Sequence, residues 1–212
     1  MRARRGELEE ASEVLGSQSL TTGKPWRVFC AVELPASVRE NLMKHVARLR
    51  EAVPQSRASW SRENNIHLTL KFFGDTEQSR ISDLNKAAAR AVEQIAPFKI
   101  SVEQTGAFPK LAAPRVLWVG IADKSGQLAR LKRNIEDECA NVGFLRDERS
   151  FHPHLTIARL RMPKESRDLA STHKDMHFEP AEVVVSELCV IRSELSSRGA
   201  KYSVLSRFGL KT

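Results

Sequence analysis

HLTL at residues 67–70 and HLTI at residues 154–157 are two copies of one short pattern in a chain of 212 residues. Successive side chains of a β-strand point to opposite faces, so each copy puts its histidine and threonine on one face and its two aliphatic residues on the other. Each copy therefore predicts a strand with one buried and one polar face. If the two strands lie side by side, their imidazoles and hydroxyls face a common cleft, an arrangement typical of acid–base chemistry on a phosphate.

Strand and helix patterns alternate around the first copy. The apolar run WRVFCAVEL at residues 26–34 predicts a strand that ends before Pro35. Aliphatic residues at helical spacing then predict an amphipathic helix over residues 36–52. The motif strand follows in IHLTLKFFG at residues 66–74, and a second apolar helical stripe covers residues 79–95.

Further strands and a helix surround the second copy. FKISVEQTGAF at residues 98–108 and PRVLWVGIA at residues 114–122 predict two strands. Apolar residues in helical register predict a helix over residues 127–141, and HLTIARL at residues 154–160 forms the second motif strand. The basic stretch at residues 161–177 has no clear periodicity, so we expect a loop there, with room for a short helix.

The chain finishes with β-branched runs at residues 181–195 and 201–210, and the turn between them predicts a hairpin. Roughly seven strands and three helices, with strands often adjacent in sequence, predict an α+β fold with antiparallel sheets. Because each half carries one motif strand, we expect two pseudo-symmetric lobes flanking a central groove, within one bilobal domain over residues 26–212. Residues 1–25 are polar and are expected to form an N-terminal extension whose composition allows disorder.

The charge balance favours a polyanionic partner. The chain has 34 Lys and Arg against 26 Asp and Glu, which gives a net charge of +8, and basic surfaces concentrate ligands that carry phosphate. Nucleic acid is preferred over a membrane, because no apolar run has the length of a spanning helix and the N-terminus lacks the apolar core of a secretion signal. We therefore expect a cytoplasmic protein, and we expect it to be a monomer.

The three cysteines, Cys30, Cys139 and Cys189, lie far apart in apolar stretches without CxxC spacing. This pattern is typical of reduced thiols rather than of a disulfide framework or a zinc site. We expect them to be buried and inert.

Two histidines suffice to divide the proton transfers of phosphodiester cleavage. One imidazole takes a proton from the attacking oxygen and the other protonates the departing oxygen, and an unperturbed pKa near 6.5 suits both roles. Thr69 and Thr156 can donate hydrogen bonds to the non-bridging oxygens of the phosphate. This chemistry needs no metal and no cofactor. A single copy of the pattern would be read as an ordinary half-buried strand, but the pair favours a catalytic site formed by His67 and His154.

The chain also resembles a known family in an ordered set of segments. These segments are RVFCAVELP, NNIHLTLKFFGD, GAFP, PRVLWVGI, FHPHLTIAR and the late SELSSRGAKY. Together they resemble the bacterial 2'-5' RNA ligase family, also called RNA 2',3'-cyclic phosphodiesterases, of the two-His phosphoesterase superfamily. The resemblance runs from about residue 26 to the C-terminus.

The resemblance implies a bilobal fold with both motifs in a central groove. It also implies metal-independent opening of a terminal 2',3'-cyclic phosphate on RNA to leave a 2'-phosphate. By the same analogy, His67 donates the proton to the departing 3' oxygen and His154 activates water. A ribose 5'-hydroxyl in place of water would join two RNA ends through a 2'-5' linkage.

Two arginines are candidates for contacts with the substrate. Arg159 follows His154 by five positions and resembles the family's arginine after the second motif, where it would bind phosphate. Strict alternation puts Arg159 on the wrong face of the strand, so this role requires a bulge or a strand end nearby. Arg115 is a weaker candidate, since a solvated surface arginine explains it equally well.

Three aromatic residues, Phe72, Phe108 and Tyr202, could stack on a base, as aromatic side chains do when single strands bind. Core packing is the preferred interpretation for the two phenylalanines.

The remaining histidines suggest no second site. His152 and His154 resemble a metal-binding pair, but no further ligands follow at a recognisable spacing, so no metal site is predicted. His45, His173 and His177 are expected on the surface.

Three alternatives to an RNA cyclic phosphodiesterase remain open or are disfavoured. A hydrolase of small cyclic nucleotides or of ADP-ribose cyclic phosphate would use the same chemistry. A non-catalytic RNA-binding module could retain the fold, with the basic segment at residues 159–174 following an RNA backbone. An ATP-dependent ligase is disfavoured, because the sequence has neither a Lys-x-Asp-Gly motif nor a P-loop.

Overall fold

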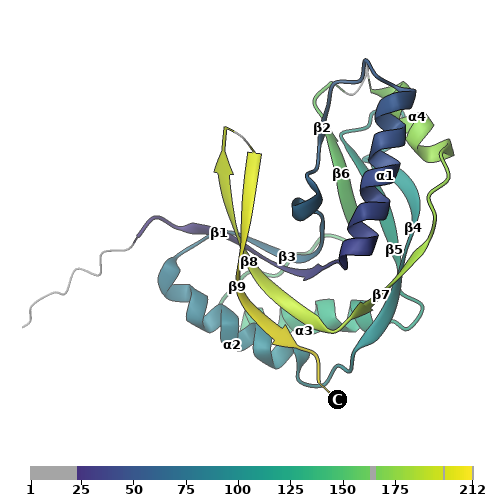
Figure 1. Cartoon of the computed structure of the whole chain (residues 1–212). Helices are drawn as coiled ribbons and strands as arrows, with labels where there is room; N and C mark the ends of the chain where they lie inside the picture. Colours follow the sequence, from purple (N-terminus) through teal and green to yellow (C-terminus); the bar gives the residue numbers. More distant parts are fainter. Residues whose placement is uncertain (1–22, 163–165, 198, 212) are drawn as a thin grey trace, which may run out of the picture.

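The computed structural model describes residues 23–162, 166–197 and 199–211. In these residues, two β-sheets and four α-helices form the arrangement drawn in Figure 1. Most of the predicted N-terminal extension, residues 1–22, lies outside the described part of the chain. None of the described helices is both long and apolar enough to cross a membrane.

All strand pairings are antiparallel, and they build two separate sheets. The four-stranded sheet has the order β3-β1-β8-β9 and the five-stranded sheet has the order β2-β6-β5-β4-β7. This confirms the predicted α+β fold with two antiparallel sheets. The strand bounds are β1 (Trp26–Glu33), β2 (Ala58–Trp60), β3 (His67–Thr76), β4 (Phe98–Phe108), β5 (Val116–Ala122), β6 (His154–Leu160), β7 (Ala181–Val185), β8 (Glu187–Ser196) and β9 (Gly199–Gly209).

Two pairs of helices cover the sheets. Helices α2 (Ile81–Val92) and α3 (Gln127–Asn141) pack together against the four-stranded sheet, and α1 (Ala36–Ala52) and α4 (Arg167–Asp175) lie along the five-stranded sheet (Figure 1). Helix α3 follows β5 of the five-stranded sheet in sequence but packs against β3 of the other sheet. The chain therefore passes back and forth between the two halves, and one continuous apolar core joins them.

Helix α1 illustrates how the apolar pattern determines an element. Val38, Leu42, Val46 and Leu49 recur every three or four residues, and all of them are buried. Burying one such side chain contributes about 1.5–3 kcal/mol. The core also contains all three cysteines, as the sequence predicts.

Strand β6 contains one extra residue after its motif. Thr156 and Ala158 pair with consecutive residues of β5, which leaves Ile157 without a partner of its own. Ile157 and Ala158 are both buried, whereas Arg159 is exposed. This bulge shifts the alternation of faces by one residue, so Arg159 returns to the face that carries His154.

Strand β3 has the same irregularity after the first motif. Thr69 and Lys71 pair with consecutive residues of β1, which leaves Leu70 unpaired in the ladder. Leu70 and Lys71 are both buried, and Phe72 is exposed. Phe72 thereby returns to the face that carries His67.

The bulge in β3 also turns a lysine toward the interior. Lys71 Nζ lies 2.5 Å from Glu136 Oε2 and donates to the carbonyl of Leu145 at 2.7 Å. Lys132 bonds the other carboxylate oxygen of Glu136. A buried charge is tolerated when it is paired and hydrogen-bonded, so this cluster anchors α3 to the motif strand.

The described residues contain nine strands and four α-helices, more than the roughly seven strands and three helices expected from the pattern. Strand β2 is only three residues long, and the β-branched run at residues 181–195 divides at Ser186 into β7 and β8, which belong to different sheets. Helix α4 forms within the basic stretch that was predicted as a loop with room for a short helix, and it buries Leu169, Ala170 and His173.

Candidate active site

Strands β3 and β6 carry the two motifs and approach each other from different sheets. A groove of about 480 Å³ lies between them. The five residues predicted to handle the phosphate all line this one groove: His67, Thr69, His154, Thr156 and Arg159. The fold thus brings together two segments that are far apart in the sequence.

Each motif histidine is oriented by the carbonyl of the residue two positions before it. His154 Nδ1 donates to the carbonyl of His152 at 2.7 Å, and His67 is hydrogen-bonded to the backbone of Asn65. The bond from Nδ1 fixes the tautomer of His154 and leaves Nε2 to meet a ligand. In both halves of the groove, the backbone two positions before the histidine thus holds the imidazole.

The protein environment favours the neutral form of both motif histidines. Burial lowers the pKa of His67 to about 4, and this effect outweighs the opposing influence of the Asn65 backbone and of Glu33. Burial also lowers the pKa of His154, and the charge of Arg159 adds to this effect, which outweighs the opposing influence of the hydrogen bond to the His152 backbone. In the absence of a ligand, both imidazoles are therefore neutral at neutral pH, and the negative charge of a bound phosphate would favour protonation.

A neighbouring loop fixes the backbone of the second motif. Ser61 Oγ donates to the carbonyl of Thr156 at 2.8 Å, and the backbone N–H of Ser61 donates to the carbonyl of Ile157 at 2.9 Å. These bonds hold the strand while the Thr156 side chain lines the groove. Arg159, placed by the bulge, lines the groove beside it.

Aromatic side chains surround His67. The Phe29 ring stacks on the imidazole with centroids 4.7 Å apart, and Tyr202 meets it edge-on at 5.1 Å. Tyr202 also lines the groove, as its predicted role requires. Phe72 lies beyond Phe29, with their ring centroids 6.4 Å apart, and is 44% exposed, so it is a surface aromatic rather than the core residue that was preferred.

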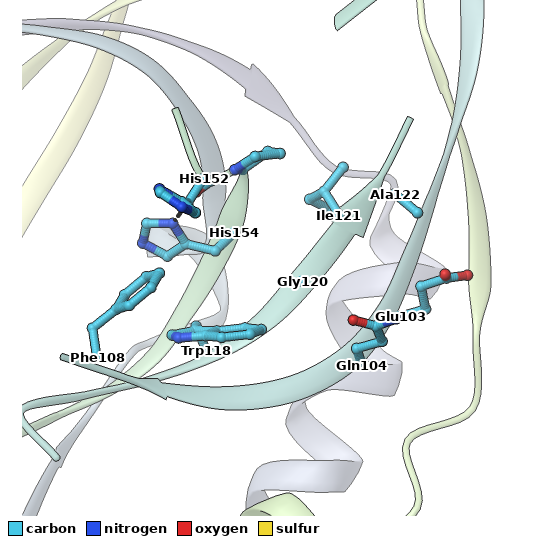
Figure 2. Close-up of a pocket in the computed structure, with 10 residues that line it drawn as sticks. Glu103, Gln104, Phe108, Trp118, Gly120, Ile121, Ala122, His152 and His154 are labelled. Atoms are coloured by element: carbon cyan, nitrogen blue, oxygen red, sulfur yellow. Dashed lines mark hydrogen bonds between the residues drawn. The ribbon is translucent and has the colours of Figure 1, made fainter. Parts of the chain in front are cut away.

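The surroundings of His154 differ. The ring of Phe108 meets its imidazole edge-on at 4.9 Å, and Phe108 lies 5.2 Å from Trp118 (Figure 2). Phe108 is half-buried and lines a second cavity that adjoins the groove. Arg115 is exposed and is not among the residues that line either cavity.

Sequence reasoning missed several residues of the groove. Asn65 bonds His67 through its backbone, and its side-chain amide donates to the carbonyl of Ala200 at 2.8 Å, which ties the β8–β9 hairpin to the motif. Arg62 contributes a second arginine to the groove. Both residues lie within five positions of His67, so proximity to the motif was the available signal.

Two of the histidines expected on the surface are buried, which corrects that prediction. His45 is 3% exposed and His173 is fully buried. They are linked by a bond of 3.0 Å between His45 Nε2 and His173 Nδ1, and His173 Nε2 bonds the carbonyl of Trp118 at 3.0 Å. These contacts join α1, α4 and β5, so the two rings take the place of apolar core residues. His177 is exposed, as predicted.

One cluster of potential metal ligands occurs in the described part of the chain. Atoms of Glu33, Glu187 and Cys189 lie within 4.8 Å of one another. The guanidinium of Arg207 already bonds both carboxylates, with Nη2 2.6 Å from Glu33 Oε2. Neither motif histidine belongs to this cluster, which the arginine makes an ion-pair network.

Comparisons with known proteins agree with this geometry. The family model described as the 2'-5' RNA ligase superfamily matches residues 35–196. A protein of Methanothermobacter thermautotrophicus named RNA 2',3'-cyclic phosphodiesterase is 31% identical over 87% of this chain and 98% of its own length. A protein of Archaeoglobus fulgidus with the same name is 32% identical over 86% of this chain and 99% of its own length.

Solved structures share the fold. A crystal structure from Thermus thermophilus superposes with a TM-score of 0.70 at 26% identity and covers 87% of this chain and 97% of its own. The crystal structure of E. coli LigT complexed with 3'-AMP gives a TM-score of 0.69 at 24% identity and covers 89% of this chain and 99% of its own. The paired motifs, the groove and these matches together place this chain in the 2'-5' RNA ligase superfamily.

Proposed function

We propose that this chain is an RNA 2',3'-cyclic phosphodiesterase, which opens a terminal 2',3'-cyclic phosphate to a 2'-phosphate. The observation that carries the proposal is that His67 and His154, on strands of different sheets, line one groove. The names of the relatives from Methanothermobacter thermautotrophicus and Archaeoglobus fulgidus support the same substrate class. The net charge of +8 suits an RNA ligand.

The two proton transfers are divided between His154 and His67, which lie on opposite sides of the groove. His154 takes a proton from water as the water oxygen attacks phosphorus, and His67 gives a proton to the 3' oxygen as its bond to phosphorus breaks. Each such transfer contributes about 10²–10⁴ in rate. The attacking and departing oxygens lie on opposite sides of phosphorus, which is why the two groups must come from opposite sides of a groove.

The remaining polar residues stabilise charge on the non-bridging oxygens. The hydroxyls of Thr69 and Thr156 donate hydrogen bonds to these oxygens, and Arg159 supplies a positive charge. The substrate itself completes the site, because its negative charge raises the pKa of His67, the group that must enter the reaction protonated.

Joining of RNA ends belongs to the same proposal. A ribose 5'-hydroxyl that replaces water beside His154 would form a 2'-5' linkage by the same proton transfers. The cytoplasmic location and the monomeric state expected from the sequence are part of the proposal as well.

The test uses an oligoribonucleotide that ends in a 2',3'-cyclic phosphate, incubated with the protein in EDTA. The expected product is the 2'-monophosphate. The absence of turnover, turnover only after metal is added, or formation of the 3'-monophosphate would each contradict the proposal.

Parallel reactions separate the alternatives. Faster turnover of mononucleoside 2',3'-cyclic phosphates than of oligomers would favour a small-molecule hydrolase. RNA binding without any hydrolysis would favour a non-catalytic module.

A further inference from the structure

A second cavity adjoins the groove on the side of His154. Its volume is about 200 Å³, and His154 belongs to the linings of both spaces. Figure 2 shows the rings of Phe108, Trp118 and His154 around it, with His152 above them. The reaction proposed above uses only His154 among these residues, so the aromatic lining is unexplained by hydrolysis.

Two glycines create the place in which the indole of Trp118 lies. Gly106 is the cross-strand partner of Trp118 in β4, and a Cβ at Gly106 would come within 2.3 Å of the indole. A Cβ at Gly120, two residues along β5, would lie 2.9 Å from the carbonyl oxygen of Glu103 and 3.3 Å from the same ring. The indole can therefore lie over β4 because Gly106 has no side chain, and Gly120 leaves further room beside the ring.

Packing alone does not account for this position of Trp118. Among the described residues, none accepts a hydrogen bond from its buried Nε1. An unsatisfied buried donor costs about 1–3 kcal/mol. The ring is half-buried and its outer face lines the cavity, so the protein holds an aromatic face open to a ligand.

Phe108 extends this aromatic surface toward the reaction centre. Its ring is tilted by 35° to the indole with centroids 5.2 Å apart, and it touches the imidazole of His154 edge-on. Every nucleobase offers a flat π face, and stacking on an aromatic side chain contributes about 1–3 kcal/mol per base. A base is therefore the RNA component that fits this surface.

The position of the aromatic surface formed by Phe108 and Trp118 indicates which RNA would supply the base: the one that carries the cyclic phosphate or the one that attacks it. In an in-line displacement, the departing 3' oxygen and its ribose lie beside His67, and the attacking oxygen lies beside His154. The cavity is on the attacking side. Water has no base to stack, but a nucleoside that attacks with its 5'-hydroxyl does.

We propose that Trp118 and Phe108 form a stacking subsite for the first base of an acceptor RNA, whose 5'-hydroxyl attacks the cyclic phosphate. In this step the 5' oxygen bonds to phosphorus and the bond from phosphorus to the 3' oxygen breaks. The hydroxyl proton passes to His154, and the proton of His67 passes to the 3' oxygen. This subsite rests on the proposed function, which it extends from hydrolysis to the selection of an acceptor strand.

The experiment compares two acceptor RNAs with a 5'-hydroxyl, one with a normal first nucleotide and one with an abasic first residue. Both are reacted with RNA ending in a 2',3'-cyclic phosphate, and the initial rates of joining and of hydrolysis are measured. The wild-type protein is expected to join the normal acceptor about 10-fold faster than the abasic one, relative to hydrolysis. In Trp118→Leu this preference should fall to about twofold or less.

A second variant covers the case that Trp118→Leu does not fold, and a control variant tests for a general effect of losing a tryptophan. Phe108→Leu should reduce the preference as well, in case Trp118→Leu does not fold. Trp26 begins β1, whereas the residue that pairs with His67 is Glu33 at the other end of that strand. Trp26→Leu therefore removes a tryptophan far from the site and should keep the wild-type preference. An equal preference for the normal acceptor in wild type and in folded Trp118→Leu, or no preference in wild type, would overturn the subsite.

A separate measurement distinguishes failure of the subsite from failure of the proposed function. If the wild-type protein turned over no cyclic phosphate, binding of the acceptor RNA would be measured instead. The chain has three tryptophans, so replacing Trp26 and Trp60 by Phe makes Trp118 the sole indole emitter. Quenching of its fluorescence by the normal acceptor but not by the abasic one would support the subsite, and any other result would overturn it.

Discussion

Arg159 shares a face of β6 with His154, although they are five positions apart and an unbroken strand would put them on opposite faces. The unpaired Ile157 makes the difference. The first motif has the same bulge, but Phe72 occupies the corresponding position there, five residues after His67. The two motif strands thus share a bulge but differ in the residue that follows it: an arginine in β6 and a phenylalanine in β3.

Replacing Arg159 should weaken substrate binding. A charge-assisted hydrogen bond to phosphate is worth about 1.5–3 kcal/mol, so Arg159→Ala should raise KM for a cyclic-phosphate oligomer about 10- to 100-fold. Arg130 is exposed on α3, away from the groove, and Arg130→Ala serves as a matched control for loss of one positive charge. Equal effects of the two substitutions would mean that Arg159 acts only through net charge.

Removing the motif hydroxyls should lower the rate without changing the fold. Thr69→Val and Thr156→Val preserve the shape of the side chain and its suitability for a strand. Each should reduce kcat/KM about 10-fold or more through loss of a hydrogen bond to a charged oxygen. Thr→Ser at either position keeps the hydroxyl and should stay within about threefold of wild type. A valine variant with normal kcat/KM would remove that threonine from the mechanism.

The value of kcat/KM for a cyclic-phosphate oligomer should decrease as the pH rises through neutrality. The reaction needs a protonated His67 and a neutral His154. Burial lowers the pKa of His67 to about 4 and also lowers the pKa of His154, so the fraction of enzyme with a protonated His67 decreases as pH rises. We expect kcat/KM to fall from about pH 6 to about pH 8, approaching tenfold per pH unit. The profile of kcat should be displaced to higher pH, because bound phosphate favours the imidazolium. A kcat/KM profile that rises over this range would contradict the assignment.

The buried pair of histidines should make the fold sensitive to acid. Burial, His173 and Arg48 lower the pKa of His45 to about 4, and burial lowers that of His173. The unfolded chain binds these protons near pH 6.5 and the folded chain does not. The stabilisation is therefore complete above about pH 6.5 and decreases as pH falls, down to about pH 4 for His45. For His45 the loss approaches about 1.4 kcal/mol per pH unit.

His45→Gln tests this, because its amide can still donate to His173 but does not titrate. Denaturant unfolding at several pH values should give a shallower loss of stability for the variant than for wild type. Identical slopes would show that the pair does not control acid sensitivity.

Sequence patterns predicted the regular parts of the fold closely. The predicted strand at 98–108, helix at 127–141 and strand at 154–160 coincide with β4, α3 and β6. Apolar periodicity is strong in these segments, and each lies in a single layer. The approach of the two motif strands was also predictable, because the two proton transfers of phosphodiester cleavage require both histidines at one phosphate.

The parts that sequence could not predict depend on tertiary context. A bulge is a property of strand pairing, so the sequence could state only that Arg159 required one. The division at Ser186 has no glycine or proline to mark it, and apolar residues continue on both sides of it in β7 and β8. The burial of His45 and His173 depends on a partner 128 positions away, and the role of Trp118 depends on Gly106 lying opposite it.

The most direct test of the account is a double-mutant cycle on His67 and His154, measured as the single-turnover rate on a cyclic-phosphate oligomer. Each alanine variant should lose about 10²–10⁴ in rate while remaining folded. Because both groups act on the same transition state, the double variant should be little slower than the worse single variant. Losses that multiply in the double variant, or a folded single variant that turns over at the wild-type rate, would contradict the claim that two imidazoles act on one phosphorus.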